Sequence, residues 1–130
     1  MILLDTDICI EILRGNEKVI QKRLETDETI AVSFMTVGEL YYGAQKSEHP
    51  SKNNYLIENF IFSVDVINSD LQILKKFGEL KTSLELTGFR IPDADLLIAS
   101  TCLTKCKKLV TRNVKHFERI DELIVDNWVS

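Results

Sequence analysis

Short apolar runs alternate with longer segments of helical periodicity along this chain. The apolar runs predict strands at 2–4, 29–33, 64–67, 108–111 and 123–125. Between them, the spacing of apolar residues predicts helices at 8–13, 17–25, 36–44, 53–60 and 93–106, a long helix from Ser69 toward Leu86 and a helical turn ending at Phe117. Strands that alternate with helices are typical of an α/β sandwich around a mostly parallel sheet. We therefore expect one α/β domain over residues 1–130, with about five strands.

Polar residues predict where three of the helices begin. Thr36 and Glu39 have the spacing of a capping box, in which the threonine caps the helix and the glutamate reaches back to it. Ser69 and Gln72 repeat that spacing ahead of the long helix. Asp93 is expected to cap the last long helix, because helix N-termini stabilise negative charge.

Composition is that of an ordinary globular domain, with 45% hydrophobic and 28% charged residues. No apolar run approaches the roughly 20 residues of a membrane span, and no basic leader is present, so we expect a cytoplasmic protein with no membrane contact. The three cysteines, Cys9, Cys102 and Cys106, suit buried thiols better than a disulfide framework.

The net charge of −4 argues against a surface that binds nucleic acid throughout. The segment 105–119 differs from the rest of the chain, because its charged residues are bases apart from Glu118. Such a segment can hold phosphate groups, or it can be solvated surface, and the sequence leaves both interpretations open.

Acidic and amide side chains are expected at one edge of the sheet. Asp5 and Asp7 follow the first strand, and Asn113 follows the fourth. Ligands bind beyond the carboxyl ends of parallel strands. Asp95 and Glu39, each in the first turn of a helix, can face the same edge. The topology therefore allows one shared pocket.

Three carboxylates in one pocket favour a bound cation, because like charges raise one another's pKa. Oxygen ligands suit Mg²⁺ or Mn²⁺, and such an ion can activate water for attack on a phosphate. Each acid also has a purely structural interpretation. Glu39 can be the acid of its capping box, and Asp5 can cap the helix that follows it. Spacing alone leaves the two interpretations equally open.

Four segments carry recognisable patterns in a fixed order. Segment 1–7 ends in Asp-Thr-Asp, 36–43 contains Glu-Leu-x-x-Gly, 95–99 reads Asp-x-x-Ile-Ala, and 109–117 contains Thr-x-Asn followed by Phe. Together, and essentially end to end, they resemble PIN-domain ribonucleases, specifically the VapC-type toxins of toxin–antitoxin pairs. The resemblance implies a PIN-like α/β/α sandwich.

The resemblance also implies a reaction, the hydrolysis of RNA phosphodiester bonds to 5′-phosphate and 3′-hydroxyl ends with Mg²⁺ or Mn²⁺. It assigns the metal to Asp5, Glu39 and Asp95. Asn113 takes a fourth polar position, where it bonds a water on the metal.

Further roles follow from the same resemblance. Thr6 and Thr111 are expected to orient Asp5 and the water, as supporting residues. Asp93 is a helix cap or a secondary ligand, and His116 is expected on the surface.

The resemblance implies three partners. The first is an RNA substrate, whose backbone would contact Arg90, Lys105, Lys108, Arg112 and Lys115. The others are a second copy of the chain, in a homodimer, and a VapB-type antitoxin whose tail fills the acidic groove, with an arginine among the carboxylates.

Two other functions fit parts of the sequence. Asp5-Thr6-Asp7 after a strand also resembles haloacid-dehalogenase-like phosphatases with Asp5 as nucleophile, although Cys9 stands where they carry Thr or Val. The second alternative is a PIN-like module that binds RNA or protein without cutting, against which the complete set of acids argues.

Overall fold

The computed structural model describes residues 1–130 and contains one five-stranded sheet. Its strands are β1 (Ile2–Leu4), β2 (Ile30–Ser33), β3 (Asp65–Ile67), β4 (Lys108–Val110) and β5 (Val125–Asp126). They lie in the order β3-β2-β1-β4-β5, and every neighbouring pair is parallel. The predicted α/β fold around a mostly parallel sheet is confirmed.

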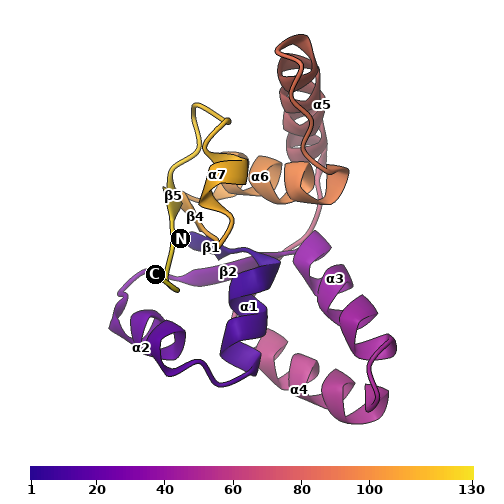
Figure 1. Ribbon diagram of the computed structural model, residues 1–130, viewed down its shortest axis with the longest axis vertical. Helices are drawn as coiled ribbons and strands as arrows, with labels where there is room; N and C mark the ends of the chain where they lie inside the picture. The colour runs from indigo at the N-terminus through magenta and orange to yellow at the C-terminus, as the bar shows by residue number, and fades with distance from the viewer.

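Helices cover both faces of the sheet. They are α1 (Thr6–Leu13), α2 (Glu17–Glu25), α3 (Phe34–Gln45), α4 (Pro50–Phe62), α5 (Leu71–Leu86), α6 (Asp93–Lys105) and α7 (Val114–Phe117). Figure 1 shows α1 to α4 below the strands and α5 to α7 above them. None of these helices is both long and apolar enough to cross a membrane.

The central strand β1 divides the core into two halves. Its side chains alternate between the faces, as those of any strand do. Ile2 and Leu4 pack among residues of α1 to α4, together with the buried Trp128, whereas Leu3 packs among residues of α5 to α7. All three strand residues are fully buried. The carboxyl end of β1 therefore lies at the centre of the sheet, and Asp5 is the first residue after it.

The start of α3 differs from the prediction. Ser33, the last residue of β2, caps the helix by accepting a hydrogen bond from the Thr36 N–H at 3.1 Å. Thr36 is thus inside the first turn, and the capping box predicted for Thr36 and Glu39 is wrong. The reason is that β2 passes directly into α3, so that its terminal serine lies at the position that caps.

The start of α5 differs in the same way. Asp70, not Ser69, accepts a hydrogen bond from the Ile73 N–H, at 2.9 Å. Aspartate and serine are comparable caps, so two adjacent candidates cannot be separated by residue type alone.

Asp93 does not cap α6. It is the first residue of that helix, after Pro92 in the capping position, and no side chain caps this end. The Asp93 carboxylate pairs instead with Lys81 of α5, at 3.0 Å.

The apolar residues of the first turn of α5 are not all buried, whereas Phe77, Leu80 and Leu84 further along the helix pack into the core. Leu71 is 84% exposed and Leu74 is 47% exposed, whereas Ile73 is fully buried. The helix projects beyond the sheet and packs against α6 (Figure 1).

The thiols follow the expectation in part. Cys9 and Cys102 are buried and unbridged, whereas Cys106, just after α6, is half-buried.

Candidate active site

Asp5 lies where β1 ends and α1 begins, and it caps that helix. Its Oδ1 accepts a hydrogen bond from the Thr6 N–H at 2.8 Å, and its Oδ2 accepts one from the Thr111 hydroxyl at 2.7 Å. Only 6% of the residue is exposed. The carboxylate is held from both sides, so its orientation is set by the sheet.

The environment of Asp5 opposes its ionisation. Burial, and next the charge of Asp7, raise its pKa from 3.8 to about 7, and Asp95 adds to the rise. Hydrogen bonds from Thr111 and Thr6 act in the opposite direction without cancelling it. A buried carboxylate beside two others is a group that a cation would stabilise in its charged form.

Asp7 belongs to the same cluster, although the prediction left it out of the metal site. Its Oδ2 accepts a hydrogen bond from the Arg112 N–H at 3.1 Å, whereas its Oδ1 is buried without a hydrogen-bond partner. Burial raises its pKa. Its place two residues after Asp5, close to the end of a strand, is the signal in the sequence that points to it.

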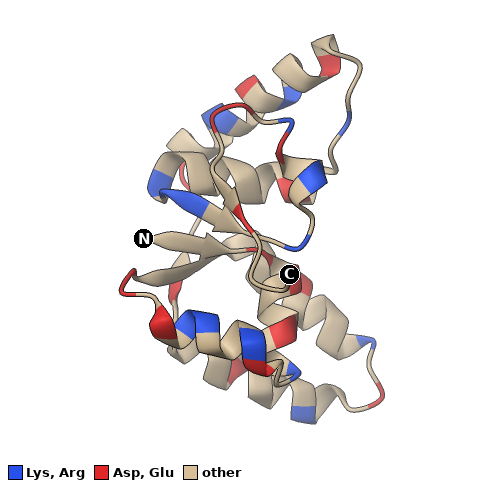
Figure 2. Ribbon diagram, turned by 60° about the vertical axis from the view of Figure 1, so that its left-hand side comes forward, with Lys and Arg blue, Asp and Glu red and all other residues tan.

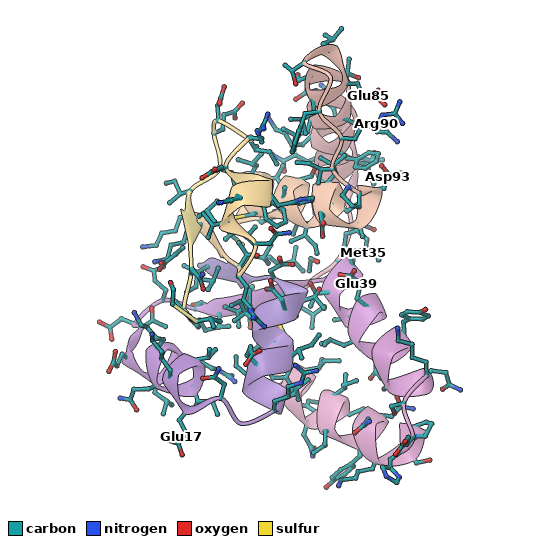
Figure 3. The ribbon with its side chains drawn as sticks, viewed as in Figure 1. Glu17, Met35, Glu39, Glu85, Arg90 and Asp93 are labelled. Carbon is teal, nitrogen blue, oxygen red and sulfur yellow. The ribbon has the colours of Figure 1, made fainter.

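Glu39 is joined to the strand end through Thr6. The Thr6 hydroxyl lies 2.7 Å from Glu39 Oε1 and 2.9 Å from the Thr36 hydroxyl. Since a hydroxyl has one proton, Thr6 donates to the carboxylate and Thr36 donates to Thr6. Figure 3 shows Glu39 on α3 below the start of α6, and these two helices are in contact.

Asp95 lies in the first turn of α6 and is half-buried, which raises its pKa. Its Oδ2 is 3.2 Å from Nε2 of His116, whose influence on that pKa is in the lowering direction. The side chain of His116 is 23% exposed. The expectation that His116 is a surface residue is therefore wrong, because α7 turns its imidazole onto the acids.

Asn113 is not brought to the acids in the same way. It is exposed, and its contact with the cluster is a hydrogen bond from its backbone N–H to the Thr111 hydroxyl, at 3.0 Å. It precedes the short helix α7 without capping it by its side chain.

The residues at this edge fit a hard divalent ion that keeps part of its water. No three His, Cys, Asp or Glu side chains lie close enough together to hold a metal ion by themselves, so water would have to supply the remaining ligands. Asp5, Asp7 and Asp95 nevertheless lie close enough for Asp7 and Asp95 to raise the pKa of Asp5, and Asp7 offers a free buried oxygen. Mg²⁺ commonly binds through one or two carboxylates and several waters.

The bases of segment 105–119 do not form one patch. Four of them are in ion pairs, each with a different carboxylate: Lys105 with Asp70 at 2.7 Å, Lys107 with Glu28 at 2.6 Å, Lys108 with Asp126 at 3.2 Å and Arg112 with Glu11 at 2.9 Å. In Figure 2 the basic and acidic segments are interspersed along the ribbon. Arg90 and Lys115 are both exposed, and neither is in an ion pair of the structure.

Residues 2–123 match the PIN domain family. The chain belongs to this family. It is 36% identical over 129 residues to ribonuclease VapC2 of Rickettsia felis, a match that covers 97% of this chain and 96% of that protein. It is 30% identical to the tRNA(fMet)-specific endonuclease VapC of Shigella flexneri, covering 97% of this chain and 96% of the other.

Solved structures agree with this assignment. The crystal structure of VapBC2 from Rickettsia felis bound to a DNA fragment from its promoter contains a chain that is 36% identical and superposes with a TM-score of 0.90. The superposition covers 98% of this chain and 99% of that one. The chain is thus a VapC-type PIN domain, and the haloacid-dehalogenase-like alternative for Asp5 is set aside.

Proposed function

We propose that this VapC-type protein is a metal-dependent endoribonuclease, the toxin of a toxin–antitoxin pair, with Mg²⁺ or Mn²⁺ held by Asp5 and Asp95 and flanked by Glu39. The observation that best supports a bound metal is the burial of Asp5, whose pKa is raised to about 7 by burial and by neighbouring carboxylates. Such a group is costly to keep ionised in the folded chain unless a cation is bound beside it. The oxygen ligands and the resemblance support Mg²⁺ and Mn²⁺ equally.

The ion, when bound, would lower the pKa of water and stabilise charge on the scissile phosphate. The protein's own part is to keep the ligands in place. Thr111 and the Thr6 N–H fix the two oxygens of Asp5, and the Thr6 hydroxyl fixes one oxygen of Glu39. Asn113, exposed beside this cluster, is free to bond a water or the substrate.

Arg90 and Lys115 are the bases best placed to hold the RNA backbone. Neither is neutralised by a carboxylate, and Arg90 lines a cavity of about 380 Å³ that reaches Asp93 at the start of α6. Figure 3 shows Arg90 close above Asp93. The paired Lys105, Lys108 and Arg112 would have to leave their partners first, so we assign them a smaller role.

A VapB-type antitoxin is the proposed protein partner, since the similar solved structures include VapBC complexes. A cavity of about 320 Å³, lined by apolar residues of α1, α3 and α4, borders Glu39 and offers such a partner a contact surface beside the site. We also propose a homodimer, which would cover apolar side chains such as the exposed Leu71. We further propose that the protein acts in the cytoplasm, where it would meet an RNA substrate.

The proposal is tested with purified wild type and the Asp95→Asn variant, each incubated with total RNA and with initiator tRNA. The tRNA is included because a relative is named for it. We expect discrete fragments from wild type with Mg²⁺ or Mn²⁺, and none with EDTA or with the variant. Intact RNA in every lane, from folded protein free of antitoxin, would favour the non-cutting binding module.

A further inference from the structure

The two histidines of the chain lie in contrasting places. His49 is exposed before α4, whereas His116 projects from α7 onto the acidic cluster. We propose that His116 supplies a nitrogen ligand to the metal centre, beside Asp95, and that the centre therefore selects Mn²⁺ over Mg²⁺. This inference rests on the proposed function, because it assigns a further ligand to the same site.

The inference rests on the position of His116 relative to Asp95. Nε2 of His116 lies 3.2 Å from Oδ2 of Asp95, yet this nitrogen is buried and makes no hydrogen bond. The direction of a proton on Nε2 thus misses the carboxylate oxygen. A buried nitrogen without a hydrogen-bond partner, this close to a carboxylate oxygen, is available to an ion that Asp95 binds.

The distance also fits neighbouring ligands of one ion. In an octahedral site with ligands at about 2.1 Å, adjacent ligand atoms lie about 3 Å apart. The observed 3.2 Å between nitrogen and oxygen is close to this value. A small divalent ion bound to Asp95 can therefore contact Nε2 of His116 without a large movement of either side chain.

The fold holds the imidazole in this place. Phe117, the next residue, is 1% exposed and anchors α7 in the core. The His116 ring lies edge-on to the Phe117 ring, with centroids 5.6 Å apart, and the His116 N–H donates to the Asn113 carbonyl at 3.1 Å. These contacts restrict the ring before any ion binds.

The ligand chemistry determines the selectivity. Mg²⁺ prefers oxygen ligands, whereas imidazole nitrogen ranks among the ligands of transition metals, and affinity for a nitrogen-containing site rises from Mn²⁺ along that series. A site made of carboxylates alone would discriminate less between Mn²⁺ and Mg²⁺. A site that adds the His116 nitrogen to the Asp95 carboxylate should bind Mn²⁺ more tightly than it binds Mg²⁺.

The test is pulsed electron paramagnetic resonance of Mn²⁺ bound to the protein, prepared with natural and with ¹⁵N-labelled histidine. We expect a nitrogen coupling that changes with the label, persists in His49→Gln and disappears in His116→Gln. Calorimetric titration should show the His116→Gln variant losing roughly tenfold or more of its Mn²⁺ affinity, with a smaller loss for Mg²⁺.

The outcomes separate this inference from the proposed function. Saturable Mn²⁺ binding that Asp5→Asn removes, without any histidine coupling in wild type, would overturn the role of His116 and leave the carboxylate site standing. No saturable binding of either ion to wild type would overturn the metal site itself. The wild-type spectrum decides the ligand even if His116→Gln is unstable.

Discussion

The Thr111 hydroxyl donates a hydrogen bond to Asp5 Oδ2 at 2.7 Å, across 106 positions of sequence. The two residues follow β4 and β1, which are neighbours in the sheet, with Leu4 paired to Val110. The contact therefore depends directly on the register of the two strands.

Replacing Thr111 by valine tests this contact, because valine keeps the shape of the side chain and removes the donor. We expect the rate of RNA cleavage to fall roughly ten- to a hundredfold, as is typical when a group that orients a metal ligand is lost. The Mn²⁺ affinity, measured by calorimetry, should fall as well. The control is Thr101→Val, since Thr101 is equally buried but bonds only the Leu97 carbonyl of its own helix. Equal losses in both variants would show a general packing effect.

Asp5→Asn should stabilise the metal-free protein at high pH. The pKa of Asp5 in the folded protein, about 7, lies above the ordinary 3.8. Ionisation of Asp5 therefore costs no stability at low pH. The cost grows as the pH rises from 3.8 to about 7 and is greatest above pH 7. In EDTA at pH 8 we expect the variant to gain about 1–3 kcal/mol, or roughly 3–10 °C in the melting temperature.

The same variant should lose the stabilisation that Mg²⁺ or Mn²⁺ gives wild type. Thermal melts at pH 4 and pH 8, with and without metal, measure both effects. At pH 4 the wild-type carboxyl is largely protonated, so the gain in EDTA should vanish. A variant that is less stable than wild type at both pH values would contradict the assigned cause of the pKa shift.

The unpaired bases make a prediction about RNA affinity. Arg90→Ala combined with Lys115→Ala should weaken RNA binding and reduce the slope of log affinity against log salt by about one to two. The matched control is the double variant Lys18→Ala and Lys22→Ala on α2. Figure 3 shows Glu17, the first residue of that helix, at the opposite end of the molecule from Arg90. Filter binding to catalytically inactive Asp95→Asn protein measures both slopes. An unchanged slope in the first double variant would show that Arg90 and Lys115 are surface residues that do not contact the RNA.

The two serines considered as helix caps should differ in their contribution to stability. Ser33→Ala removes the hydrogen bond to the Thr36 N–H and should cost about 1 kcal/mol of unfolding free energy. Ser69→Ala should cost much less, because Asp70 caps the neighbouring helix. Urea denaturation of the two variants measures the difference, and a larger cost for Ser69 would restore the capping prediction made from sequence.

Several features could be predicted from the sequence because they depend on neighbours along the chain. Apolar runs and helical periodicity located the strands and the main helices, and polar residues after β1 and β4 marked the edge of the sheet that carries the site. The pattern of four motifs pointed to the PIN-domain family, which the matches confirm.

Contacts between distant residues had to come from the tertiary structure. The candidates for each helix cap, Ser33 or Thr36 for α3 and Ser69 or Asp70 for α5, are alike in residue type. Only the path of the chain selects Ser33 and Asp70. The pairing of Lys105 with Asp70 likewise depends on how α5 lies beside α6.

The sequence by itself determined the fold class, the family and the acids at the end of β1 and the start of α6. Only the tertiary structure decided that His116, rather than Asn113, lies against Asp95, and that Asp7 keeps a buried unpaired oxygen. The physical reason is that periodicity and strand ends are local properties of the chain. The direction of one side chain on α7 is instead set by packing Phe117 into a core built from the whole sequence.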